Sequence, residues 1–348
     1  MASRLTHFLQ IAREANASDL QLSTGAVPWM RVEGELKRIP EAQLEGDEVD
    51  ALALELLALA EADTGQDVDF SLALDDLGRF RCNVHRHDRG TGISLKCIPL
   101  DVPDLGSLGL PETLEDLTWY RTGLVLVTGP AGCGKSSTLA ALLQRVNSTR
   151  REHVITIEEP IEFVFPSDQC NVTQREVGRH TQSFENALRS ALREDPDVIL
   201  VSELRDLRAI RTAIIAAETG HLVLATLHTR DAASTVNRII DVFPPNEQDQ
   251  IKTMVAGSLR TVICQQLVKP KSGTRRVPAY EILKVTPAVA NLIRDGKTHL
   301  IPGQLQLGRK HGMIDLDTRL QEMINENLIT QEVAHGHAVN PKRFGGTA

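Results

Sequence analysis

Apolar and polar positions follow two different patterns along the 348 residues, with a change near residue 100. Before that point, short helical and extended patterns alternate. They predict helices over 5–15 and 49–62, a strand over 19–23, a hairpin over 29–32 and 36–39, and a strand pair over 78–86 and 92–98. This mixture is typical of a small α+β domain.

A different pattern follows a segment rich in proline and glycine. We place an N-terminal domain at 1–100, a linker at 101–111 and a second domain at 112–348. In the second domain, the hydrophobic pattern predicts a helix over 136–146 and buried strands over 124–128, 154–157, 198–201 and 222–226. Strands separated by helices are typical of an α/β fold with a parallel sheet. The pattern becomes mostly helical from Ala233 to Ala338, and we expect a loose tail over 340–348.

Composition and charge narrow the classes of function. Hydrophobic residues make up 41% of the chain and aromatic residues only 3%, so the core rests on aliphatic side chains. The net charge of −8 disfavours nucleic acid as a partner, because that binding relies on clustered Lys and Arg. The five cysteines form no C-x-x-C pair, which disfavours a zinc ribbon and indicates a reducing compartment. No signal peptide or membrane-spanning run is expected.

The strongest motif is GPAGCGKS at 129–136, which fits the G-x-x-x-x-G-K-[ST] phosphate-binding loop between a predicted strand and a predicted helix. Lys135 is expected to reach the β- and γ-phosphates, and Ser136 to hold Mg²⁺. Cys133 occupies a free position of the motif and is expected to fill space. The expected nucleotide-binding residues of this segment are Gly129, Gly132, Cys133, Gly134, Lys135, Ser136 and Ser137.

Carboxylates follow two of the other predicted strands. Glu203 comes after 198–201, where an apolar strand delivers a carboxylate to the edge at which the P-loop opens, and it is expected to serve Mg²⁺. Glu158, Glu159 and Glu162 follow 154–157, with Pro160 ending the strand. One of these three side chains could position the attacking water. A solvated carboxylate is the alternative interpretation of Glu203, and without the P-loop it would be the favoured one for the group after 154–157.

Two histidines flank the predicted strand 222–226. His221 and His228 are seven residues apart, and this spacing along an extended strand disfavours a shared metal site. Each is expected to act through hydrogen bonds, one of them near the γ-phosphate. A structural histidine is an equally good interpretation of either one alone.

Taken together, these motifs resemble the type IV pilus retraction ATPases, the PilT family of the secretion ATPase superfamily. The resemblance covers nearly the whole chain and rests on the P-loop and on the segments 155–163, 191–197 leading into Glu203, 219–222 and 226–229. It implies a PAS-like N-terminal domain, a RecA-like ATPase domain, and a homohexamer that binds ATP and Mg²⁺ between subunits.

The resemblance also implies roles for individual residues. Glu162 matches the catalytic glutamate of the Asp box, Glu203 the Walker B carboxylate, and His221 and His228 the His box. Arg81 resembles an arginine that the N-terminal domain brings to the nucleotide, which suits a planar guanidinium. The implied function is ATP hydrolysis that drives pilus retraction and twitching motility. The implied location is the cytoplasmic face of the inner membrane, on a platform protein, together with a paralogous retraction ATPase.

Five positions depart from the family pattern, and four other functions stay open. Glu159 replaces an Asp and Ser202 a Gly; Lys96, Gln21 and Ala290 replace an Arg, a His and an Arg. The missing arginine at Ala290 bears on retraction rather than on hydrolysis. The alternatives are a pilus assembly or type II secretion ATPase, an accessory retraction paralogue, a nucleic-acid motor and a non-catalytic nucleotide-binding regulator. Assembly ATPases usually carry a tetracysteine zinc insertion, which this chain lacks.

Overall fold

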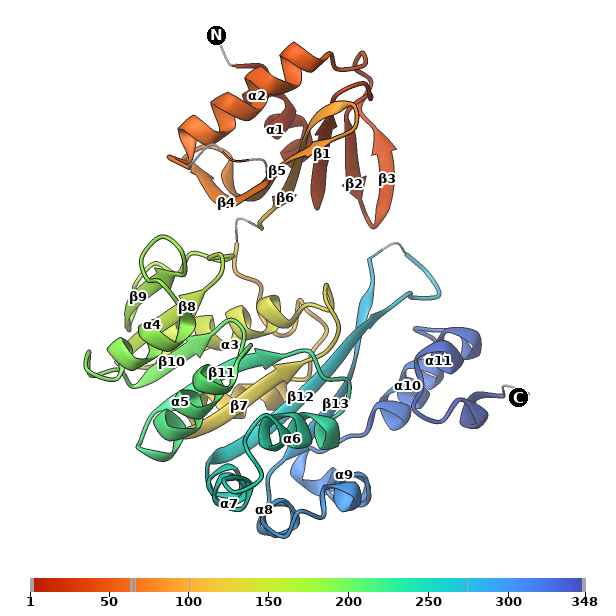
Figure 1. The fold of residues 1–348 in the computed structure, drawn as a ribbon. Coiled ribbons are helices and arrows are strands. Elements are labelled where there is room, and N and C mark those ends of the chain that lie inside the picture. Colours follow the sequence, from red (N-terminus) through yellow and green to blue (C-terminus); the bar gives the residue numbers. More distant parts are fainter. Residues whose placement is uncertain (1–2, 63–64, 66, 100, 274, 346–348) are drawn as a thin grey trace. The chain divides into compact units, whose positions relative to one another are not determined.

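The chain divides into two compact units (Figure 1). A computed structural model describes residues 3–62, 65, 67–99, 101–273 and 275–345. Unit 1 comprises Met1–Asp101 and Pro160–Phe163, and unit 2 comprises Val102–Glu159 and Val164–Ala348. Residues 102–111 of the predicted linker therefore belong to unit 2, where Leu110 is buried.

Unit 1 is built on a six-stranded antiparallel sheet with the order β3-β2-β1-β6-β5-β4. The strands are β1 (Asp19–Ser23), β2 (Trp29–Val32), β3 (Glu35–Arg38), β4 (Asp67–Leu74), β5 (Gly78–His87) and β6 (Gly90–Cys97). Helices α1 (Arg4–Glu14) and α2 (Gly46–Leu59) pack on the face that carries Leu20, Phe80 and Leu95. Because side chains alternate along a strand, Arg81 and Lys96, which are register partners, lie on the other face.

The sequence patterns predicted both helices and every strand of unit 1 except β4. This strand lies at the edge of the sheet, and Leu72 is its one fully buried side chain. Its sequence does alternate, with Val68, Phe70, Leu72 and Leu74 on one face and Asp67, Asp69 and Ser71 on the other, so the period-2 pattern was a usable signal that was overlooked. The α+β class is confirmed, while the PAS-like assignment stays a prediction.

Unit 2 contains a seven-stranded sheet with the order β13-β12-β7-β11-β10-β8-β9. The strands are β7 (Gly123–Thr128), β8 (His153–Glu158), β9 (Asn171–Glu176), β10 (Val198–Val201), β11 (Leu222–Leu227), β12 (Leu259–Val268) and β13 (Val277–Lys284). All neighbouring pairs are parallel except β12 and β13. The predicted α/β fold with a parallel sheet is confirmed, and the carboxyl ends of β7, β11, β10 and β8 meet at one edge.

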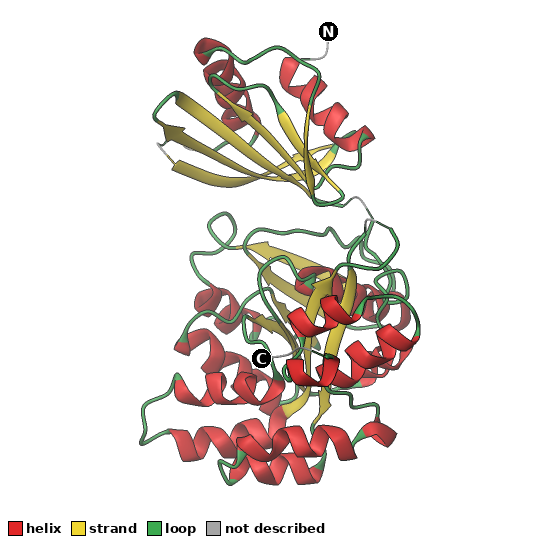
Figure 2. Ribbon diagram, turned by 90° about the vertical axis from the view of Figure 1, so that its right-hand side faces the viewer, coloured by secondary structure: helices red, strands yellow, loops and turns green. Residues whose placement is uncertain are grey.

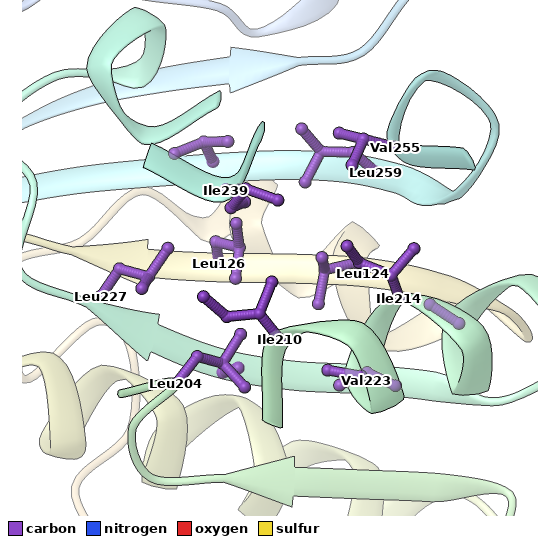
Figure 3. Packing of buried hydrophobic residues seen from close by; sticks show 14 of the residues in the cluster. Leu124, Leu126, Leu204, Ile210, Ile214, Val223, Leu227, Ile239, Val255 and Leu259 are labelled. Carbon is purple, nitrogen blue, oxygen red and sulfur yellow. The ribbon is translucent and has the colours of Figure 1, made fainter. Parts of the chain in front are cut away.

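Helices cover the sheet of unit 2 on both sides (Figure 2). One face packs against helices that share a continuous aliphatic cluster with Leu124, Leu126 and Val223 (Figure 3). The α-helices of this unit are α3 (Lys135–Thr149), α4 (Phe184–Ala191), α5 (Leu207–Glu218), α6 (Ala232–Asp241), α7 (Gln248–Ser258), α8 (Pro287–Arg294), α9 (Ile301–Leu307), α10 (Leu316–Asn325) and α11 (Gln331–His337). Short 3-10 helices are η1 (Glu112–Trp119), η2 (Thr298–Leu300), η3 (Arg309–His311) and η4 (Pro341–Phe344).

One prediction for the C-terminal third is incomplete and another is wrong. The segment after Ala233 is mostly helical, as expected, but it also contains the long antiparallel pair β12 and β13, which was not predicted. Strand β12 lies inside the sheet and is buried on both faces, so it lacks the alternation that marks a half-buried strand. The expected loose tail over 340–348 includes η4, where Phe344 packs into a cluster with Leu320 and Met323 of α10. Residues 346–348 lie outside the described residues.

Within the described part of the chain, none of the helices has the length and apolar character needed to cross a bilayer.

Candidate active site

The P-loop connects β7 to α3 and depends on glycine at three positions. Gly129, Gly132 and Gly134 have φ angles of 141°, 71° and 91°, which side-chain-bearing residues rarely adopt. A Cβ at Gly129 would lie 2.2 Å from the carbonyl oxygen of Gln265. Helix α3 begins at Lys135, so its unpaired N–H groups and the positive end of its dipole face the loop. The loop therefore has the backbone of an anion-binding site.

Lys135 lies across the loop that contains it. Its Nζ donates to the carbonyl oxygens of Gly129 and Pro130, both at 3.0 Å, and lies 3.5 Å from Nδ1 of His228. These contacts hold the ammonium group at the loop, where it can meet phosphate oxygens. Ser136 is exposed at the first turn of α3, while Cys133 is buried. Burial raises the pKa of the Cys133 thiol, in keeping with the expected space-filling role.

The ends of the neighbouring strands bring charged side chains to the same edge. Glu203 follows β10, and its Oε1 lies 3.1 Å from Nε2 of His228, which follows β11. Its Oε2 accepts a hydrogen bond of 2.8 Å from Nε of Arg205. Arg205 also forms an ion pair with Glu159, the residue directly after β8. Contacts therefore run from Lys135 through His228, Glu203 and Arg205 to Glu159, which we call the strand-end network.

The electrostatics of this network favour a charged Arg205. Burial works against the cation, but the hydrogen bond and charge of Glu203, with the charge of Glu159, outweigh it and raise the pKa of Arg205. An open pocket of about 400 Å³ lies beside the network and is lined by Glu203, Leu204, Arg205, Leu227, His228, Thr229 and Arg238. The site thus combines an anion-binding loop, a cation held at that loop and a carboxylate facing a pocket.

Glu158 has a different environment from the carboxylates around it. Its side chain is buried and accepts hydrogen bonds from Oγ1 of Thr156 at 2.6 Å and Nε2 of Gln174 at 3.1 Å. The second partner comes from the adjacent edge strand β9. These bonds tie Glu158 into the sheet, which favours a structural role for it over water activation.

Glu162 and Arg81 belong to unit 1, so the site built within unit 2 contains neither of them. Oε1 of Glu162 lies 3.9 Å from Nζ of Lys96, and Lys96 is the register partner of Arg81 on the neighbouring strand. Unit 1 therefore has its own charged side chains on this face of its sheet, since Asp19 of β1 is also in register with Lys96. Glu162 and Arg81 are the two of them that the sequence linked to nucleotide chemistry.

The two predicted His-box residues lie at opposite ends of β11. Gly123 N–H donates to the carbonyl oxygen of His221 at 3.0 Å, which places His221 at the amino edge of the sheet. Nδ1 of His221 lies 2.9 Å from the carbonyl oxygen of Ala216. The six residues of β11 span roughly 20 Å at about 3.3 Å each. The structure therefore brings His228 to the P-loop of its own chain but not His221, and the two imidazoles cannot share an ion.

Two contributors were missed by the sequence analysis. Arg205 comes two residues after Glu203 and directly before Asp206. A cation between two carboxylates was a signal that it could pair with acidic residues at the strand ends. Gln265 is a buried amide within the apolar run of β12, and its side chain bonds the P-loop backbone. A polar side chain inside a buried strand requires a partner, so its position was a usable signal.

Comparisons with known proteins agree with this geometry. Residues 31–335 match the model of the type II/IV secretion system protein family. PilT of Pseudomonas aeruginosa, a type IV pilus retraction ATPase, is 45% identical over 343 residues, which cover 98% of this chain and 99% of PilT. A twitching motility protein of Neisseria gonorrhoeae is 44% identical over 316 residues, with 90% and 84% covered.

A solved structure supports the same assignment along the whole chain. The crystal structure of the pilus retraction motor PilT with bound ADP matches with a TM-score of 0.88 and 39% identity, covering 99% of each chain. Sequence identity and fold thus both point to one protein group. The chain belongs to the type II/IV secretion system protein family and, within it, to the PilT family of pilus retraction ATPases.

Proposed function

We propose that this chain is the subunit of a homohexameric motor that hydrolyses ATP to ADP and phosphate and uses the energy to retract type IV pili. The observation that carries the proposal is the strand-end network, in which Lys135 of a complete P-loop connects through His228 to Glu203. The 45% identity to a retraction ATPase over 98% of the chain supports the type of work.

Within unit 2, the proposed roles follow the geometry. The P-loop N–H groups bind the phosphates, and Lys135 neutralises charge on the transferred phosphoryl group. His228 lies between Lys135 and Glu203 and is placed to respond when Lys135 turns to a γ-phosphate. The hydroxyl of Ser136 and the carboxylate of Glu203 are oxygen donors of the kind that Mg²⁺ prefers, so these residues fit the ion. When bound, Mg²⁺ would neutralise phosphate charge.

Two further roles lie in unit 1. We assign Glu162 as the residue that orients the attacking water and Arg81 as the cation that stabilises transition-state charge from a neighbouring subunit. Glu162 already faces a cation, since its carboxylate lies 3.9 Å from Lys96. We assign His221, at the amino edge of β11, to nucleotide contact from an adjacent subunit, because its own P-loop is roughly 20 Å away.

The proposed setting follows from the same family membership. The hexamer would work in the cytoplasm at the inner membrane, held there by a pilus platform protein and accompanied by a paralogous retraction ATPase. No nucleic acid is required by this proposal, and the net charge of −8 supports that view.

Two experiments test the proposal at separate levels. Purified protein should release phosphate from ATP only with Mg²⁺, and Lys135→Ala should abolish that release while the circular dichroism spectrum stays unchanged. A deletion strain should keep or increase its surface pili while losing twitching motility. A strain without pili that regains them on complementation would instead identify an assembly motor, and would leave the ATPase assignment intact.

A further inference from the structure

The side-chain amide of Gln265 in β12 bonds the P-loop at one end and the first turns of helix α3 at the other. Its Nε2 donates to the carbonyl oxygen of Cys133 at 2.6 Å, and its Oε1 accepts from Oγ1 of Thr138 at 2.9 Å. The side chain is buried, with 3% of the residue exposed. Leaving a buried amide without hydrogen-bond partners is costly, and here both of its polar atoms have one.

The backbone approaches closely at the same place. A Cβ at Gly129 would lie 2.2 Å from the carbonyl oxygen of Gln265, and a Cβ at Gly134 would lie 3.1 Å from its Nε2. The first and last constrained glycines of the loop therefore both lie against Gln265. Strand β12 runs beside β7 with Cys264 opposite Thr128, so Gln265 stands directly where the loop leaves the sheet.

The bond to Cys133 determines the direction of a neighbouring donor. A trans peptide is planar, and its carbonyl and N–H groups point in opposite directions. The carbonyl oxygen of Cys133 points to Gln265, beneath the loop, so the N–H of Gly134 points away from Gln265. That N–H belongs to the turn that precedes Lys135, where a phosphate-binding loop presents its donors.

We propose that Gln265 is a positioning residue that holds the P-loop in its phosphate-binding conformation through the Cys133 carbonyl and the Thr138 hydroxyl. The inference rests on the proposed function, since it concerns how the same loop binds nucleotide. The amide acts as a fixed support: one end orients the Cys133–Gly134 peptide, and the other ties that peptide to the first turns of α3. Thr138 strengthens the link, because its Oγ1 also lies 3.2 Å from the carbonyl oxygen of Gly134.

The next residue along β12 offers a matched control. Oε1 of Gln266 lies 2.9 Å from Nδ1 of His337 in α11, on the side of the strand away from the P-loop. Gln265→Met and Gln266→Met each remove one amide from the same strand and keep a similar side-chain volume. Only the first removes contacts with the P-loop.

The test measures ADP affinity, KM for ATP and kcat for the full-length protein and both Met variants. Gln265→Met should weaken ADP binding and raise KM about tenfold or more, because it removes both hydrogen bonds of the amide, while kcat changes less. Gln266→Met should bind as wild type does. If Gln265→Met binds ADP as wild type does, the inference is wrong. If the wild-type protein itself binds no nucleotide, the proposed function fails and the inference with it.

Two further variants guard against a general loss of folding. Thr138→Val keeps the side-chain shape and should weaken ADP binding less than Gln265→Met does. Both substitutions break the same hydrogen bond between Thr138 and Gln265. The loss of ADP affinity in the double variant should therefore not exceed the sum of the two single losses. Gln265→Glu keeps the side-chain size, but a carboxylate has no proton to donate to the Cys133 carbonyl, so this variant should bind ADP poorly at neutral pH. Wild-type ADP affinity in Gln265→Glu would overturn the proposal.

Discussion

Replacing Gly129 with alanine tests how strictly the P-loop depends on its backbone. The φ angle of Gly129 is 141°, and an added Cβ would lie 2.2 Å from the carbonyl oxygen of Gln265 and 2.7 Å from Sγ of Cys133. The first of these atoms belongs to the backbone of β12 and cannot rotate away. We therefore expect the loop itself to move in Gly129→Ala.

The size of the effect can be worked out against a control. Gly220 has a φ of 122° but no atom within 4 Å of an added Cβ, so Gly220→Ala brings backbone strain without overlap. That strain is worth about 1–3 kcal/mol, and forcing extra volume into a packed site adds about 1–3 kcal/mol. Gly129→Ala should lose about 2–6 kcal/mol of unfolding free energy, compared with about 1–3 kcal/mol for Gly220→Ala.

Urea unfolding and ADP titration together check this reasoning. Gly129→Ala moves a carbonyl that bonds Lys135, and a hydrogen bond to a charged group is worth about 1.5–3 kcal/mol, so ADP affinity should fall about tenfold or more. Gly220 lies next to His221, at the edge of the sheet opposite the P-loop. Its variant leaves the P-loop of the same chain unchanged and should therefore lose less ADP affinity than Gly129→Ala. Equal losses of stability and unchanged ADP binding in both variants would refute the argument.

Three other predictions concern chemistry, assembly and pH. Glu162→Gln should bind ATP nearly normally but turn over about 10²–10⁴-fold more slowly, and wild-type turnover would rule out its role in orienting water. Mixing Arg81→Ala with Lys135→Ala subunits should restore some ATPase activity; no recovery in rings shown by mass to be mixed would contradict a contribution in trans. Burial raises the pKa of Glu281 to about 7, above its ordinary value of 4.5. Between these two values the folded chain keeps a proton on Glu281 that the unfolded chain has lost. The free energy of unfolding in urea should therefore fall from pH 5 to 7 in wild type but not in Glu281→Gln.

Much of the site could be predicted from the sequence because its parts are local motifs. The P-loop is contiguous, and Glu203 and His228 each follow an apolar run that reads as a buried strand. Parallel strands present their carboxyl ends at one edge, so these residues were expected near each other before any strand order was known. The order β7-β11-β10-β8 then determines which of them touch.

The parts that were missed depend on contacts between distant segments. Gln265 lies 132 residues after Cys133, and nothing local to either residue indicates that one supports the other. Glu159 and Arg205 are 46 residues apart and meet only because β8 and β10 are neighbours in the sheet. Strand β12 was missed for a different reason, since a strand buried on both faces loses its alternation.

Three of the departures from the family pattern lie in structurally different places. Two lie beside residues proposed to act in ATP hydrolysis, and one lies in the segment that the resemblance links to retraction. Glu159 keeps a carboxylate where an Asp is usual, and that carboxylate pairs with Arg205 in the strand-end network. Lys96 keeps a cation where an Arg is usual, 3.9 Å from Glu162. Both substitutions preserve charge beside residues assigned to catalysis. Ala290 does not preserve charge, because an uncharged side chain stands where the family pattern has an Arg. It lies on α8, half-buried against the aliphatic cluster of unit 2. We therefore expect the changes at Glu159 and Lys96 to spare the proposed ATP hydrolysis, and the change at Ala290 to bear on its coupling to retraction.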